Sequence, residues 1–231
     1  MKTATGYGQF CPVAMASEVL CTRWTVLILR ELCAGSTRFN ELRKGVPLMS
    51  PSLLSKRLKE LEKYGVVQRA KSNEPGTYDY RLTQAGQDLQ PIVLSMGSWG
   101  QKWVDKQSSL RNLDPSLLMW DMRRNLDPTP MPDKRCVIQF LYSELPKKQR
   151  WWLVIDQNGV DLCLTDPGHD VDLYVVTDLR TMTAIWMGLT TVRSELEAGR
   201  LELTGDAALK RTIQTWLGLS PFAKEKKRVA A

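Results

Sequence analysis

The stretch PSLLSKRLKELEKYGVV, residues 51–67, has two faces of opposite chemistry. Ser50 is a favourable helix N-cap residue, and Pro51 suits the first helical position. With about 100° between successive residues, Leu54, Leu58 and Leu61 fall on one side of such a helix. The other side carries small hydroxyls and ammonium groups, from Ser52, Ser55, Lys56, Lys59 and Lys63. The stretch therefore predicts a helix that packs through leucine and presents a basic stripe, without an acidic residue, to solvent.

Short elements are predicted on both sides of this helix. Apolar residues at helical spacing predict helices over residues 13–20 (VAMASEVL), 23–32 (RWTVLILREL) and 38–46 (RFNELRKGV). After the helix, residues 66–70 (VVQRA) and 78–82 (YDYRL) are typical of strands, and the turn-rich KSNEPGT joins them. The order predicts a small helical domain with a wing-like hairpin.

Positive charge is concentrated in the first half of the 231-residue chain, whose net charge is +7. Residues 1–109 carry 15 Lys or Arg and 9 Asp or Glu, a net of +6, whereas residues 110–223 carry 13 and 15, a net of −2. Ammonium groups neutralise phosphates, and short serines let a helix reach base edges in a major groove. We predict double-stranded DNA as the partner; the alternative is a merely solvated helix face. The predicted DNA contacts are Arg38, Ser50, Pro51, Ser52, Ser55, Lys56, Lys59 and Lys63, with Arg69, Lys71, Asn73 and Arg81 from the hairpin.

A long apolar stripe follows the hairpin. Thr83 is a predicted N-cap for a helix over residues 84–107, which Pro91 should kink or deprive of one hydrogen bond. The apolar residues at helical spacing are Leu89, Ile92, Val93, Met96, Trp99 and Trp103. The stripe exceeds what a small monomer can bury, so we predict a dimer interface; the alternative is packing on its own domain or on the second one.

The second half has a different pattern. The polar, proline-bearing stretches SSLRNLDPS (108–116) and RRNLDPTPMPDKR (123–135) are typical of a linker. Strand-like runs follow at 136–142, 150–156, 160–165 and 171–177, then helical runs at 180–189, 190–199 and 208–218, with a short strand at 200–205. We predict an α+β chain with domains 1–109 and 110–222 and a basic, disordered tail over 223–231.

Residues 11 to about 105 resemble the winged helix-turn-helix of the HxlR branch of MarR-type bacterial regulators. The matching motifs are Cys11-Pro12, W-T-x-x-I-L-R-E-L from Trp24, R-F-N-E-L from Arg38, S-x-x-x-L-S-x-R-L-K-E-L-E-x-x-G-V-V from Ser50 and Y-x-L-T-x-x-G from Tyr80. The resemblance implies a homodimer on a pseudo-palindromic operator, with Ser52, Ser55, Lys56 and Lys59 in the major groove and residues 71–77 as the wing tip. One departure is Cys21, where the family usually has glycine.

The stretch from about residue 115 to residue 222 resembles the sterol carrier protein 2-like fold. The matching motifs are D-L-R-T-M-T-x-I-W-x-G (178–188), G-R-L-E-L-T-G-D (199–206) and the closing W-L-G (216–218). The resemblance implies a sheet of about five strands and helices around a cavity for an apolar ligand. Aromatic linings are also what small-molecule pockets use, and the alternative is an aromatic core. The predicted pocket residues are Trp120, Trp151, Trp152, Leu173, Trp186 and Trp216.

The five cysteines are widely spaced and contain no C-x-x-C pair, which disfavours a disulfide framework and a zinc site. Cys11 lies just before a predicted helix start, where a thiol pKa can fall. The family resemblance implies that members use this position to sense oxidants or electrophiles. Cys11 is therefore a candidate redox residue; the alternative is an inert cysteine.

Other classes of function find little support. The single histidine, His169, has no nucleophile signature near it, and no phosphate-binding loop or metal-spaced cluster occurs, so we expect no enzyme, no metal and no cofactor. The first residues fit neither a secretory signal nor a transit peptide, and no window is apolar enough for a membrane helix. We expect a cytoplasmic, nucleoid-associated protein without a membrane partner.

The sequence therefore favours a homodimeric transcription regulator that a hydrophobic molecule modulates through the second domain. Two alternatives remain open. The first is a carrier of hydrophobic ligands that attaches non-specifically to nucleic acid, and the second is a thiol-based redox regulator that acts through Cys11.

Overall fold

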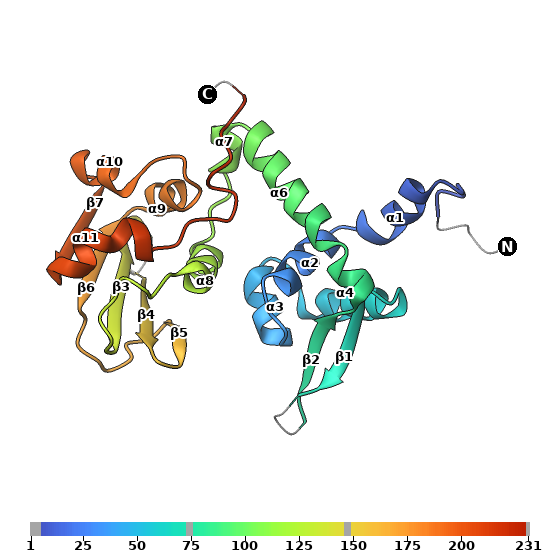
Figure 1. Cartoon of the computed structure of the whole chain (residues 1–231), viewed down its shortest axis with the longest axis horizontal. Coiled ribbons are helices and arrows are strands. Elements are labelled where there is room, and N and C mark those ends of the chain that lie inside the picture. The colour runs from blue at the N-terminus through green and yellow to red at the C-terminus, as the bar shows by residue number, and fades with distance from the viewer. Residues whose placement is uncertain (1–5, 73–75, 146–148, 230–231) are drawn as a thin grey trace. The chain divides into compact units, whose positions relative to one another are not determined.

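The computed structural model describes residues 6–72, 76–145 and 149–229 (Figure 1). Its contacts divide the chain into two compact units, residues 1–97 and 98–231. The division falls inside helix α6 (Gln90–Trp103) and not after residue 109. The first eight residues of this helix thus belong to the first unit and the last six to the second.

The first unit contains the helices and the hairpin that the sequence predicts. Its elements before α6 are α1 (Pro12–Leu20), α2 (Thr25–Cys33), α3 (Phe39–Gly45), α4 (Pro51–Lys63), β1 (Val67–Lys71), β2 (Tyr78–Leu82) and α5 (Gln84–Gln87). The strands β1 and β2 pair antiparallel, from Val67 opposite Leu82 to Lys71 opposite Tyr78. This arrangement is a winged helix-turn-helix.

The core of the first unit forms between α2, α4 and the hairpin. Ile28, Leu29, Leu54 and Leu58 are fully buried there, in one cluster with Val67. The turn between α1 and α2 needs no glycine at Cys21, whose φ is −83°. Instead Trp24 takes a left-handed conformation, with φ of 80°, directly before α2.

The predicted helix over residues 84–107 is broken. The Thr83 hydroxyl accepts a hydrogen bond from the Gly86 N–H at 3.2 Å, which confirms the predicted N-cap. However, α5 ends at Gln87, and α6 restarts at Gln90 and ends at Trp103. Pro91 is the second residue of α6, where an N–H has no intrahelical partner to lose. The proline therefore marks a helix start and not a kink.

The second unit is an α+β domain around a five-stranded mixed sheet in the order β5-β4-β3-β6-β7. Strands β3 and β6 run parallel, and the other neighbours run antiparallel. Its strands are β3 (Cys136–Tyr142), β4 (Arg150–Asp156), β5 (Gly159–Cys163), β6 (Leu173–Thr177) and β7 (Leu201–Gly205). Its helices after α6 are α7 (Lys106–Ser109), α8 (Pro115–Asn125), α9 (Leu179–Trp186), α10 (Val192–Glu197) and α11 (Ala207–Trp216).

The core of this unit lies on one face of the sheet. Strand alternation points Ile138, Phe140 and Tyr142 of β3 to the same side, and all three are fully buried. They belong to one cluster with Met182 of α9 and Ile213 of α11, so these helices cover that face.

The stretches 108–116 and 123–135, predicted as a linker, are partly helical, because the end of α7 and both ends of α8 lie within them. Asp114 caps α8, since its carboxylate accepts from the Leu117 N–H at 2.9 Å, and Pro115 takes the first helical position. Met119 and Met122 of this helix are fully buried. The polar residues that suggested a linker are the cap and the solvent side of a core helix.

The predicted disorder over residues 223–231 is also wrong as far as residue 229, the last residue described. Arg228 donates its backbone N–H to the Lys102 carbonyl at 2.9 Å, and Glu225 pairs with the Lys102 ammonium at 3.0 Å. The basic composition suggested disorder, but contacts with residues far back in the chain order the segment.

Candidate nucleic-acid interface

The α4 helix forms the expected support for a binding surface. The Ser50 hydroxyl accepts from the Leu53 N–H at 3.3 Å, and Pro51 is the first helical residue. Leu54, Leu58 and Leu61 are 0–2 % exposed, so the leucine face anchors the helix in the core. The opposite face is thereby fixed toward solvent.

That solvent face carries the predicted basic stripe. Four of its residues are exposed and Ser55 is half-buried. Together with Glu60, these five residues line one shallow hollow of the surface: Ser52, Ser55, Lys56, Lys59 and Lys63. Glu60 is an acidic residue at the border of the stripe that the sequence prediction left out. The Arg57 guanidinium forms an ion pair with it, and so offsets its repulsion of phosphate.

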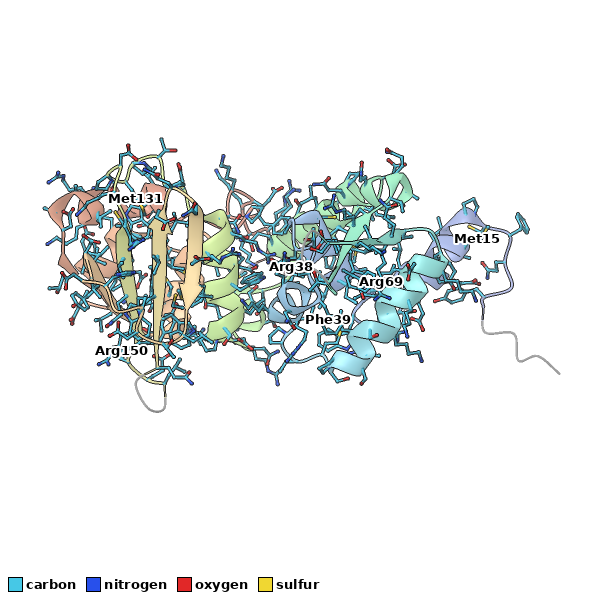
Figure 2. All side chains as sticks on the ribbon, turned by 90° about the horizontal axis from the view of Figure 1, so that it is seen from below. Met15, Arg38, Phe39, Arg69, Met131 and Arg150 are labelled. Carbon is cyan, nitrogen blue, oxygen red and sulfur yellow. The ribbon has the colours of Figure 1, made fainter. Side chains whose placement is uncertain are left out.

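The hairpin brings further basic groups to the first unit (Figure 2). The Arg69 guanidinium lies over the Tyr78 ring, 3.5 Å from the ring centroid, and both side chains are exposed. Lys71 is exposed at the end of β1, whereas the predicted contact Asn73 lies outside the described residues. The cation–π contact holds the Arg69 plane in one orientation.

Arg81 and Arg38 are held by contacts within the unit. Arg81 pairs with the Asp79 carboxylate at 3.1 Å, which balances part of its charge. Arg38 is half-buried. Its backbone forms an isolated antiparallel β-bridge with Asp79, and its backbone N–H donates to the Glu41 carboxylate at 3.0 Å. These two arginines therefore serve the junction of α3 with β2 as well as any DNA contact.

Sequence analysis missed two residues of this surface. Tyr78 was assigned only to a strand, and the hairpin register, with Lys71 opposite Tyr78, is what places it beside Arg69. Arg57, which the sequence analysis did not single out, has a mostly buried side chain that donates to the Arg23 carbonyl at 3.3 Å. A register argument could have found the tyrosine from sequence.

A second surface of the unit is apolar. Helix α1 has no buried residue, and Phe10, Val13 and Met15 on or before it are 97 %, 74 % and 57 % exposed. Met15 marks this helix in Figure 2, and Figure 1 shows it projecting from the rest of the unit. A groove of about 660 Å³ lies between α1, α2 and α6, where Ile92 and Met96 line it.

The six residues of the predicted dimer stripe separate into two groups. Val93 is buried in the core of the first unit, and Leu89 is half-buried against that core. Both point inward, which corrects their assignment to an interface. The other four members of the stripe are exposed: Ile92, Met96, Trp99 and Trp103.

Cys11 is the N-cap residue of α1 and is exposed. The backbone N–H groups of Ala14 and Val13, at the start of the helix, favour the thiolate and lower the pKa of the thiol. This is the environment that makes a thiolate available at lower pH. Cys21, also exposed, ends the same helix.

The predicted ligand residues of the second unit do not share one surface. Trp151 and Trp152 are neighbours on β4, so they point to opposite faces of the sheet. Trp151 packs on Tyr142 at 5.2 Å between ring centroids, and Trp216 donates its indole N–H to the Leu209 carbonyl at 2.9 Å. Leu173 is fully buried in the same core. These contacts contradict the prediction that all six residues line one pocket.

The remaining two tryptophans differ in their surroundings. Trp120 lies under the Arg123 guanidinium, 4.7 Å from the ring centroid. Trp186 of α9 is half-buried against the core. Within the described ranges, the indole N–H groups of Trp151, Trp152 and Trp186 are buried without a hydrogen-bond partner.

Features of an enzyme or a membrane protein are also testable on the described residues. Among them, no group of three or more His, Cys, Asp or Glu side chains could hold a metal ion. His169 is exposed, with Arg135 at 3.2 Å. No single helix in the described ranges is long and apolar enough to span a membrane, and α1 with α2 passes that test only as a pair bent by 83°.

Comparison with known proteins identifies the first unit. The model of the HxlR-like helix-turn-helix family matches residues 19–108. The uncharacterized HTH-type transcriptional regulator YdeP of Bacillus subtilis is 36% identical over 101 residues, which cover 43% of this chain and 79% of that protein. The regulator YvaP of the same organism is 40% identical over 99 residues, covering 42% of this chain and 92% of that protein.

A solved structure gives a similar match. The redox regulator HypR in its reduced form is 34% identical, and the match covers 39% of this chain and 91% of that chain, with a TM-score of 0.37. The relatives are transcription regulators and not enzymes, as the sequence predicted. These matches extend over about two fifths of the chain.

Proposed function

Because the chain belongs to the HxlR family of helix-turn-helix transcription regulators, we propose that it binds a pseudo-palindromic operator as a homodimer and that its second unit modulates this binding. The α4 helix would lie in the major groove, with Ser52, Ser55, Lys56 and Lys59 toward the DNA. The hairpin would follow the adjacent backbone through Arg69 and Lys71. Such a regulator acts in the cytoplasm, on the nucleoid.

The observation that carries the DNA contact is the α4 stripe. Its leucines are buried in its own unit, so the helix cannot rotate to hide the lysines, and Glu60, a carboxylate at the border of the stripe, is paired with Arg57. A rigid helix with ammonium and hydroxyl groups on one face suits both phosphates and base edges.

The observation that supports the homodimer is α1. Only Val19 and Leu20 of this apolar helix pack, half-buried, against the core of its own unit, and no residue of α1 is fully buried. Burial of the remaining apolar surface would be worth roughly 25 cal/mol per Å². A second copy would cover α1 and the exposed side of α6 at Ile92 and Met96. A closed twofold arrangement would also place two α4 helices for two half-sites.

The test is selective DNA binding at fixed salt. The protein is titrated into a duplex from upstream of its own gene and into a scrambled duplex of equal length. We expect a preference of about 10³ or more for the upstream duplex, lost in the double variant Lys56→Ala with Lys59→Ala. The control removes two positive charges from α11 instead, with Lys210→Ala and Arg211→Ala, and should keep the preference. Equal binding of the wild type to both duplexes would favour a carrier that attaches to nucleic acid non-specifically.

We propose that the effector that modulates operator binding through the second unit is an apolar molecule with a hydrogen-bond acceptor. Three buried indole N–H groups lack partners among the described residues, at Trp151, Trp152 and Trp186. A buried donor without a partner is unfavourable, and an acceptor on a ligand would satisfy the donor that it reaches. Because Trp151 and Trp152 point to opposite faces of the sheet, one ligand would serve only one of these two indoles. Addition of medium-chain fatty acids should quench tryptophan fluorescence and shift operator affinity; no change in either would exclude this class of effector.

A second candidate function is thiol-based control through Cys11. Its exposure and lowered pKa favour a reactive thiolate at the start of α1, the helix proposed for the dimer. An oxidant should then release operator DNA from the wild type, but not from Cys11→Ser. If an oxidant still releases operator DNA from Cys11→Ser, this role is excluded. The matched control is Cys21→Ser, from which the oxidant should release the DNA as from the wild type.

A further inference from the structure

Residues 220–229 pass over the surface of the second unit, and we refer to this segment as the strap. At one end the Ser220 N–H donates to the Trp186 carbonyl of α9 at 2.8 Å. At the other end the Arg228 N–H donates to the Lys102 carbonyl of α6 at 2.9 Å. The strap therefore connects the end of α9 with the last turn of α6.

Polar side chains of the strap converge on a short stretch of chain, residues 102–109. Glu225 pairs with the Lys102 ammonium at 3.0 Å, and hydrogen bonds from Lys102 and Ser98 lower the pKa of its carboxyl. The Lys227 ammonium donates to the Val104 carbonyl at 2.6 Å and to the Ser109 hydroxyl at 3.0 Å. The target is thus the end of α6 and the last residue of α7.

Gly188, just after α9, is where the strap approaches most closely. The residue has φ of +71°, and a Cβ built there would lie 2.6 Å from the Ala223 carbonyl oxygen and 2.9 Å from the Ala223 Cβ. Those distances are too short for any side chain. The absence of a side chain at Gly188 is therefore a condition for the strap to lie where it does.

The strap is not fully packed. A hollow of about 280 Å³ separates it in part from the unit beneath, between Gln101 and Lys106 on one side and Ala223 and Lys227 on the other. Its ion pair is also half-exposed, so it contributes little by itself. Segments with few buried apolar contacts open locally before the rest of a domain does.

We propose that the strap is a releasable latch that fixes the end of α6, and that its release lowers operator affinity. The second part rests on the proposed function. Arg228 lies 5.8 Å from the ring centroid of Trp103, an exposed residue of the proposed dimer surface on α6. A latched helix end presents this surface in one arrangement, whereas a released end samples several, and operator binding then has to restore the order.

The experiment compares two glycine substitutions in the full-length chain. Gly188→Ala places a methyl group against Ala223, whereas Gly199→Ala, with φ of +67° and no atom within 4 Å, imposes a similar backbone strain away from the strap. Hydrogen exchange is followed in peptides that cover residues 98–109 and 220–229. We expect faster exchange in both peptides for Gly188→Ala only, and circular dichroism confirms that both variants fold.

Operator binding of the same two variants tests the second part. Gly188→Ala should bind the operator at least about fivefold more weakly than Gly199→Ala, the lower end of typical coupling between sites. Unchanged exchange in Gly188→Ala would overturn the latch itself. Faster exchange with equal operator affinity would overturn its regulatory effect. If the wild type shows no operator preference, the proposed function fails while the exchange result still decides on the latch.

Swapping the charges of the ion pair between Lys102 and Glu225 gives an independent check if Gly188→Ala does not fold. Lys102→Glu and Glu225→Lys each place like charges together, and the double variant restores an opposite pair. We expect faster exchange over residues 220–229 in each single variant and recovery in the double variant. Additive effects of the two changes would contradict a contact between strap and α6.

Discussion

Helices α1 and α4 belong to the same unit but differ in what holds them. Three leucines of α4 are almost fully buried, whereas no residue of α1 is buried at all. One helix is stabilised by its own chain, and the other exposes its apolar residues. The comparison separates a surface that the chain prepares for DNA from a surface that fits a second copy.

The largest effect should come from the core of α4. Leu58→Ala removes a fully buried side chain and should reduce the free energy of unfolding by about 2–5 kcal/mol, as measured by urea denaturation. Leu48→Ala is the matched control because Leu48 is 83 % exposed, and it should change stability by less than about 0.5 kcal/mol. Equal losses in the two variants would show that α4 is not anchored by its leucines.

The next effect concerns α1 and the oligomeric state. Val13→Asp with Met15→Asp should weaken self-association by about 100-fold or more, because carboxylates would be buried in the interface, while the folding of each chain stays intact. Sedimentation equilibrium measures this change. Leu164→Asp, at a residue 67 % exposed in the second unit, is the control. A wild type that stays monomeric at high concentration would remove the homodimer from the proposal.

A smaller effect distinguishes two kinds of residue on the α4 stripe. Loss of Lys56 and Lys59 should reduce the slope of log affinity against log salt by about 2, because each ammonium releases about one counterion. Ser55→Ala should leave that slope unchanged and reduce only the discrimination between sequences. The measurement is operator affinity over a range of salt concentrations. A change of slope in Ser55→Ala would contradict this division of roles.

The smallest effect is at the start of α1. The N–H groups of Ala14 and Val13 favour the thiolate, so the pKa of Cys11 is lower in the folded chain than in the unfolded chain. The rate of iodoacetamide labelling at Cys11 should therefore reach its midpoint at lower pH in buffer than in urea. Mass spectrometry measures it site by site. By linkage, this thiolate favours the folded helix start at high pH and ceases to do so as pH falls through the folded pKa.

Regular spacing made the first unit predictable. The faces of α4, its Ser50 cap and the Thr83 cap depend on neighbours within one helical turn, and the structure reproduces all three. The motifs of the family extend over the same residues. A local rule is sufficient where the chain's own periodicity sets the outcome.

Errors arose where a side chain had two possible partners. Val93 and Ile92 are adjacent apolar residues of one stripe, yet only Val93 reaches the core. Trp151 and Trp152 are equally aromatic, but the strand turns them to opposite faces. Hydropathy alone cannot choose between such neighbours, because the choice depends on what packs against each of them.

The sequence by itself determined the basic stripe, the winged hairpin and the succession of strands, because each follows from spacing over a few residues. Only the tertiary structure decided that α1 buries no residue fully in its own unit, that the Arg57 guanidinium donates to the Arg23 carbonyl and that residues 220–229 bind the end of α6. The last contact joins groups more than a hundred positions apart, such as Lys227 and Val104. Contacts at that separation depend on the packing of the whole unit, which no local pattern of residues records.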